Sequence, residues 1–454
     1  MTNGSRTLSG LRLHLTQPVD GASLAAFRIL LGLVMVSGLV RFLLSGWVEE
    51  LLVRPSYFFK YPGLEWLPVW EPQGLHIHIG VAICAALCVA VGFAYRVSCL
   101  VFIMSFLSLQ AMDMSNYLNH YYLVVILFSL LLCMPAHRNF SVDQALSRRD
   151  PQPFVPRWVI YLLRFQVAMV YLYAAIAKIG TDWLLYAQPM SIWLSARTHL
   201  PVIGPYLTAP ELAFIMSWAG LVYDLTIVGF LLWARTRVIA YCAVLVFHGA
   251  TWALFDIGMF PIIMVTATTI FFSPSWPRKM FRLRVPDTSL APSFAISKPW
   301  LVAGVIWMAF QAVFPARHYF YDGNVLWNEN GMRYAWKVMV REKMGSITYR
   351  VVRHTDGRRW DVNPARYLEP RQLSEMSGQP DLIVQLAHFI HQDFARLGKG
   401  DVAVKVDALV SLNGRPAARL IDPDVDLIQE GWRIHQHVLP LPNVPPLDPR
   451  RKGR

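Results

Sequence analysis

Long runs of apolar residues recur along this chain and decide most of what it can fold into. About 20 apolar residues cross the hydrocarbon core of a bilayer as a helix. Runs near this length predict about nine membrane spans, at residues 24–46, 74–95, 97–112, 118–134, 157–178, 210–233, 238–255, 257–273 and 299–315. Charged residues make up 16% of the chain, whereas soluble domains average about 25%. These features exclude an ordinary soluble enzyme, a fibrous protein and a disordered protein.

Basic residues gather on one side of the predicted spans. With the N-terminus placed inside, the inside loops carry residues such as Arg96, Arg235 and Lys279, while the outside loops lean acidic. This distribution is the one that the positive-inside rule describes. It predicts a cytoplasmic N-terminus and an extracytoplasmic region after the last span. We interpret the net charge of +13 as topology and attraction to anionic membrane lipid, and not as nucleic-acid binding.

The last third of the chain has the sequence pattern of a soluble domain. Alternating segments on either side of Asp356-Gly357 and of Asn413-Gly414 predict two β-hairpins. Apolar residues at helical spacing predict an amphipathic helix over residues 381–395. We therefore expect an α-helical polytopic membrane bundle over residues 1–315 and a small extracytoplasmic α+β domain over residues 316–454, which ends in a Pro-rich basic tail.

The cellular location is the next inference from composition. All five cysteines lie in or at the edge of apolar runs, so no disulfide framework is expected. Together with the short C-terminal region, this favours a bacterial inner membrane over an endoplasmic reticulum. No set of Cys and His residues has zinc-binding spacing, and we predict no metal.

Polar residues inside the predicted spans are the candidates for function. Ionisable side chains are costly in lipid, so each one is a functional candidate. Three polar clusters lie in the outer half of the predicted bundle, where they can share one cavity. They comprise residues 113–122 with Asp113, Asn119 and His120, residues 171–183 with Tyr171, Lys178 and Asp182, and the single residue His248.

A base-driven reaction on a lipid-like ligand such as a quinone would use these residues. A desolvated Lys178 can lose its proton and act as a general base. His120 and Asn119 can position a ligand oxygen. Two simpler interpretations remain, in which Lys178 is a snorkelling anchor and His120 is an interfacial hydrogen-bonding residue.

A set of short motifs runs in order along nearly the whole chain. In this order they resemble the vitamin K-dependent gamma-glutamyl carboxylases, whose membrane part is the HTTM domain. The motifs are Ser23-Leu-Ala-Ala-Phe-Arg28, residues 94–99, Asp113 to His120, Ala175-Ile-Ala-Lys178 with Asp182-Trp183, Phe247-His248, Ile257-Gly-Met-Phe260, residues 273–279, Tyr334-Ala-Trp336 and residues 421–426.

The resemblance implies a coupled reaction. Reduced vitamin K, a naphthohydroquinone, is oxidised by O2 to its epoxide, a peptide Glu loses a γ-proton, and CO2 adds to give γ-carboxyglutamate. The implied catalytic residues are Lys178, which starts the oxygenation, and His120. Asp113, Asn119, Tyr171 and His248 are then expected to bind the quinol, and Trp336 is expected to bind the substrate.

The sequence also departs from the family pattern. Ala177 stands where the animal enzymes have a second Lys, and Arg341-Glu-Lys343 replaces their His-x-Arg pair. Arg341 and Lys343 can clamp a substrate carboxylate, or they can be solvated surface charges. The animal enzymes also have a longer C-terminal region that recognises a substrate propeptide. Three hypotheses therefore stay open: a membrane carboxylase of peptide or protein Glu, a quinol epoxidase without carboxylation, and a non-catalytic membrane binding protein.

Overall fold

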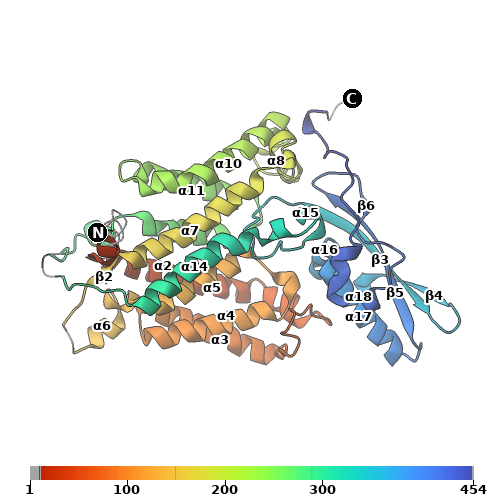
Figure 1. The fold of residues 1–454 in the computed structure, drawn as a ribbon, viewed down its shortest axis with the longest axis horizontal. Coiled ribbons are helices and arrows are strands. Elements are labelled where there is room, and N and C mark those ends of the chain that lie inside the picture. Colours follow the sequence, from red (N-terminus) through yellow and green to blue (C-terminus); the bar gives the residue numbers. More distant parts are fainter. Residues whose placement is uncertain (1–9, 11, 149, 288, 290, 452–454) are drawn as a thin grey trace, which may run out of the picture.

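The computed structural model describes residues 10, 12–148, 150–287, 289 and 291–451 of the chain. It shows an elongated helical bundle with a sheet-containing domain at one end (Figure 1). A helix lies at each of the predicted apolar runs. These helices are α2 (Ala22–Leu44), α3 (Pro72–Val91), α4 (Tyr95–Ala111), α5 (Asn119–Cys133), α7 (Arg157–Lys178), α10 (Pro210–Leu232), α11 (Arg237–Leu254), α12 (Phe260–Thr268) and α14 (Lys298–Val313).

Six helical segments among the described residues are long and apolar enough to cross a membrane. They are α2, α3, α7, α10, α11 and the segment Lys298–Phe320, which continues α14. Tyr95–Ala111, Asn119–Cys133 and Phe260–Phe271 are apolar but shorter. The helical membrane class is therefore confirmed, and the count of about nine full spans stays a prediction. The N-terminal segment and the C-terminal domain lie at opposite ends of the bundle (Figure 1).

The C-terminal domain is a four-stranded antiparallel sheet covered by helices. Its strand order is β4-β3-β5-β6, with β3 at Lys343–Arg353, β4 at Arg359–Val362, β5 at Val402–Leu412 and β6 at Ala418–Arg419. Helix α17 (Pro380–Arg396) buries an apolar face that packs on β5. Both hairpins and the amphipathic helix agree with the predictions, and the α+β class is confirmed. Residues 452–454 of the predicted basic tail lie outside the described residues.

Polar contacts and one buried aromatic residue attach this domain to the bundle. Asp182 accepts hydrogen bonds from both terminal nitrogens of Arg415, each at 2.6 Å. Asp113 Oδ2 accepts a hydrogen bond of 2.7 Å from Gln372, which belongs to α16 (Pro370–Met376). Trp336 is fully buried within the apolar core of the bundle. The C-terminal domain therefore closes the end of the bundle that lies away from the N-terminal segment.

A buried arginine holds the opposite end of the bundle together. Arg28 lies on α2 and is fully buried. Its guanidinium donates hydrogen bonds to the carbonyl oxygens of Ala90, Ala136, Asn139 and Phe140, over distances of 2.5–3.3 Å. A buried cation needs such partners, because burial without them is costly. Arg28 thus ties α2 to the C-terminal end of α3 and to the loop after α5.

We predict that Arg28→Leu lowers the stability of the folded protein by about 3 kcal/mol, because four buried carbonyl groups lose a donor. Arg28→Lys is expected to lose less, since an ammonium still donates to some of these oxygens. Thermal unfolding in detergent, followed by scanning fluorimetry, measures the effect. Arg96→Leu, at an exposed arginine of the same end, is the control. Equal melting temperatures for Arg28→Leu and the wild type would show that the hydrogen bonds of Arg28 do not stabilise the fold.

Candidate functional site

Lys178 forms a buried ion pair within the bundle. It is the last residue of α7, and 6% of its surface is exposed. Its Nζ donates to Asp224 Oδ2 at 2.8 Å and to the carbonyl oxygen of Ala174 at 3.2 Å. It also lies 5.4 Å from the ring centre of Trp183. The ammonium points into the protein, so Lys178 is not a snorkelling anchor.

Asp224 was absent from the sequence predictions. It lies well inside α10 (Pro210–Leu232), and it is also 6% exposed. The signal was present, because an acidic residue inside an apolar span is a functional candidate by the rule that identified Lys178. The carboxylate supplies the countercharge that a buried ammonium requires. Lys178 and Asp224 therefore form a buried ion pair that joins α7 to α10.

A second polar pair lies beside this ion pair. Tyr171 Oη and His248 Nε2 are 3.0 Å apart, and both side chains are buried. His248 Nδ1 has no hydrogen-bond partner among the described residues. Lys178, Asp224, Tyr171 and His248 line one small cavity of about 80 Å³, whose other walls are mainly apolar. This volume is far below the usual range for a ligand pocket of roughly 300–1,000 Å³.

His120 lines a different and larger cavity. The volume of this cavity is about 560 Å³, and Asn119 also lines it. Asn119 accepts a hydrogen bond of 3.0 Å from Tyr117, whose hydroxyl in turn accepts one of 2.8 Å from the backbone N–H of Tyr334. The C-terminal domain thus fixes the residue next to His120. A cavity of this size can hold a ring system such as a naphthoquinone.

An apolar wall separates the two cavities. Phe260, the first residue of α12, has its ring centre 6.1 Å from those of both His120 and His248. The three predicted polar clusters therefore do not share one cavity as expected, because Phe260 fills the space between the two histidines. The residues that line both cavities are Phe255, Ile257, Phe260, Val338 and Met339.

The remaining predicted site residues have other surroundings. Asp113 lines neither of these cavities, and its carboxylate accepts hydrogen bonds from the backbone N–H of Ser115 and from Gln372. Trp336 stacks on Tyr122, with ring centres 5.1 Å apart. This contact anchors the chain two residues before Val338, which belongs to the dividing wall. Asp113 thus joins the two parts of the protein, and Trp336 positions the wall.

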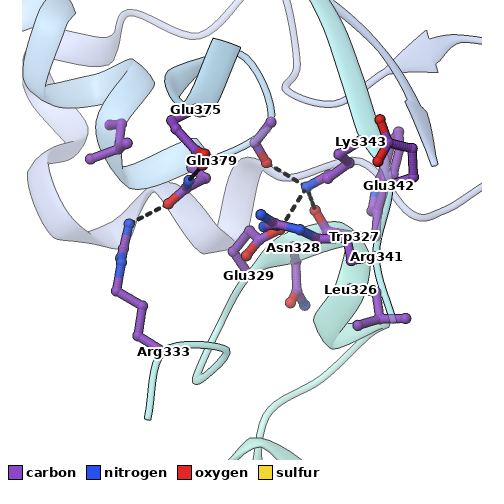
Figure 2. Close-up of polar contacts among 12 residues, drawn as sticks. Leu326, Trp327, Asn328, Glu329, Arg333, Arg341, Glu342, Lys343, Glu375 and Gln379 are labelled. Atoms are coloured by element: carbon purple, nitrogen blue, oxygen red, sulfur yellow. Dashed lines mark hydrogen bonds and ion pairs between the residues drawn. The ribbon is translucent and has the colours of Figure 1, made fainter. Parts of the chain in front are cut away.

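Arg341 and Lys343 already hold a carboxylate, that of Glu329 (Figure 2). Glu329 Oε1 lies 2.5 Å from Arg341 Nη1 and 3.2 Å from Lys343 Nζ. Lys343 Nζ also donates to the carbonyl oxygens of Trp327 and Gly378. The side chains of Lys343 and Glu329 are 3% and 5% exposed, so Lys343 is not a solvated surface charge. A substrate carboxylate could bind here only by displacing Glu329.

Comparison with known protein families identifies the chain. Residues 16–276 match the HTTM domain, and residues 296–443 match the lumenal domain of vitamin K-dependent gamma-carboxylase. This chain belongs to the vitamin K-dependent gamma-carboxylase family. No solved structure matches it. The family resemblance inferred from the short motifs is therefore confirmed, whereas the roles of single residues are not tested by it. The predicted division after residue 315 stays a prediction.

We expect the stability of the folded protein to depend on pH through Lys343, which lies in the ion triad with Glu329 and Arg341. Burial lowers the pKa of Lys343 to about 8, although Glu329 opposes this, against an ordinary value of 10.5. Between these values the unfolded chain binds more protons, so the contribution of Lys343 to stability rises with pH. Over the full range between the two pKa values, the contribution of Lys343 to the free energy of unfolding changes by about 3 kcal/mol.

Melting temperatures of the wild type and Lys343→Met, measured from pH 7.5 to pH 9.5, test this expectation. The wild-type value should rise relative to that of the variant as the pH increases. Subtracting the variant removes the contribution of the other titrating groups. A difference that stays constant or falls over this range would contradict the lowered pKa.

Proposed function

We propose that this protein is an integral membrane enzyme that oxygenates a reduced naphthoquinone of the vitamin K class and couples this reaction to the carboxylation of a peptide Glu. Membership of the carboxylase family supports the class of reaction. The observation that carries the proposal is the buried pair of Lys178 and Asp224, directly behind the wall of a cavity of ligand size. We also propose a bacterial inner membrane, with the N-terminus in the cytoplasm.

The larger cavity fits the quinol ring and the smaller one does not. Most of the surface of the larger cavity is apolar, with His120 and Asn119 available to bind a ring oxygen. When bound, the hydroquinone supplies, with O2, the strong oxygen base that removal of a γ-proton from Glu requires. The side chains of Phe260 and Met339 must move before Lys178 can reach a ligand in this cavity, because both lie in the dividing wall.

Lys178 and Asp224 are proposed to start the reaction by accepting a proton. In a water-excluded site, the charged pair and the neutral amine–acid pair are closer in energy than they are in water, because desolvation penalises both charges. A shift of the proton from Lys178 to Asp224 leaves a neutral amine that can act as a base. His248 and Tyr171 offer further hydrogen bonds on the same side of the wall.

One observation favours the alternative of epoxidation without carboxylation. Arg341 and Lys343 were the expected partners of a substrate carboxylate, and Glu329 occupies both of them. A quinol epoxidase has no need of a second carboxylate site. The two functions share Lys178 and the quinol cavity, and they differ only in whether a Glu side chain binds next to the quinol.

We expect Lys178→Ala to lower the rate of epoxide formation at least about 100-fold, which is the usual effect of losing a general base. Asp224→Asn should cause a loss of similar size, since it removes the acceptor of the Lys178 proton. The dissociation constant for the oxidised quinone should stay unchanged in both, because neither side chain lines the larger cavity. Initial rates of epoxide formation, measured by chromatography on protein in nanodiscs, provide the test.

Lys298→Ala, at the exposed first residue of α14, is the matched control and should behave like the wild type. Size-exclusion profiles and quinone binding establish that each variant is folded. Lys178→Ala protein that is folded, binds quinone and produces epoxide at the wild-type rate would refute the assignment of the base.

A further inference from the structure

Two arginines at the larger cavity have no carboxylate partner. Arg41, on the last turn of α2, and Arg371, on α16, both line the cavity that contains His120. Neither has a carboxylate within ion-pair distance among the described residues. Arg371 Nε donates a hydrogen bond of 3.4 Å to Asn116, and the Arg41 guanidinium lies 4.8 Å from the ring centre of Trp47.

Three arginines of the C-terminal domain already have carboxylate partners. Arg333 is paired with Asp381, Arg341 with Glu329, and Arg415 with Asp182. These pairs fix segments of the C-terminal domain to each other or to the bundle. Arg41 and Arg371 differ from them, because they lie on opposite sides of the junction between bundle and domain and retain most of their donors. They are therefore available to a ligand that enters the larger cavity.

Gly258 brings Arg41 close to His120. A side-chain carbon built on Gly258 would lie 3.8 Å from His120 Nε2 and 4.0 Å from Arg41 Nη2. The backbone of Gly258 has a φ of +62°, a conformation that favours glycine. The guanidinium and the imidazole thus face the same small recess, which stays open because this residue has no side chain.

The lining of the cavity carries two arginines and two acidic residues, and one of the acidic residues is neutralised by an arginine outside the lining. The two acidic residues are Glu50 and Asp256. Asp256 is ion-paired with Arg197. Glu50 makes no ion pair with either cavity arginine within 4.0 Å. One carboxylate from a ligand would therefore find two guanidiniums with free donors, and both arginines are open to solvent.

We propose that Arg41 and Arg371 bind the side-chain carboxylate of the substrate glutamate, in the cavity that contains His120 and in place of Arg341 and Lys343. This inference rests on the proposed carboxylase function and names where its second substrate binds. Guanidinium groups bind carboxylates through paired, charge-assisted hydrogen bonds. Because the γ-carbon is bonded directly to the carboxylate carbon, this contact also places the reacting C–H group in the same cavity as the proposed quinol.

A pair of fluorescent peptides tests the site without requiring turnover. Both are acetylated and amidated at their ends, and they differ only in a single Glu or Gln, so the Glu peptide carries one carboxylate. Binding to the full-length protein in phosphatidylcholine nanodiscs is measured by anisotropy. The wild type should prefer the Glu peptide. Arg41→Gln and Arg371→Gln should each weaken Glu-peptide binding about tenfold and leave Gln-peptide binding unchanged.

Conservative and distant substitutions serve as controls. Arg41→Lys should retain part of the preference, because it keeps the charge but loses the paired donors. Arg350→Gln, on the exposed face of β3, should bind both peptides like the wild type. Size-exclusion profiles and melting temperatures show whether each variant is folded, because Arg41 and Arg371 line the proposed quinone cavity itself. Equal binding of both peptides by the wild type, or an equal loss of both peptides in the variants, would overturn the proposal.

A lipid phosphate is the competing occupant, since arginines at a membrane edge also bind anionic headgroups. Native mass spectrometry with phosphatidylglycerol added resolves this. Variants that release phosphatidylglycerol but keep the preference for the Glu peptide would show that the arginines bind lipid, and the proposal would be wrong. Glu-selective binding that depends on Arg41, in a protein that makes no epoxide, would contradict the proposed activity and leave this binding site standing.

Discussion

The ion pair between Lys178 and Asp224 is the interaction on which the rest of the proposed site depends. Either charge alone would be costly within an apolar bundle. Together they hold the end of α7 against the middle of α10. This contact places a titratable pair in a small cavity that only apolar side chains separate from the larger one. In this structure the proposed base therefore lies apart from the cavity of ligand size.

The C-terminal domain completes the cavities rather than only covering them. Asp182 with Arg415, and Asp113 with Gln372, attach the domain to the outer end of the bundle. The same domain inserts Trp336 into the core of the bundle. The segment that follows brings Val338 and Met339 to the wall that the two cavities share. The two regions matched by the family therefore contribute to one site. This explains physically why a membrane bundle and an outer domain occur together in this chain.

Much of the fold could be predicted from sequence, because its signals are local. Apolar runs and turn residues located the helices and hairpins, and the cost of polar groups in lipid singled out Lys178, His120 and His248. The same rule would have found Asp224 had it been applied to every span. Phe260 could not be recognised as a wall residue, because its role depends on how α12 packs against two other helices.

The sequence gives little indication of which charged residues of the C-terminal domain form ion pairs with one another. Glu329 carries no local sign that it neutralises Arg341 and Lys343, since the three residues meet only after the strand β3 and the short helix before Glu329 have packed. Arg41 and Arg371 belong to different parts of the chain and meet at one cavity only in the folded protein. Such pairings are set by tertiary packing, which a single sequence does not reveal.

We propose that one membrane site couples quinol oxygenation to carboxylation of Glu. The most direct test supplies the protein in nanodiscs with a reduced naphthoquinone, O2, labelled bicarbonate and a Glu-containing peptide, and measures epoxide and fixed label in the same tube. Coupling of the two reactions predicts both products, with label found in the peptide as γ-carboxyglutamate. Folded, quinone-binding protein that forms neither product would contradict it, and epoxide without label would contradict the coupling.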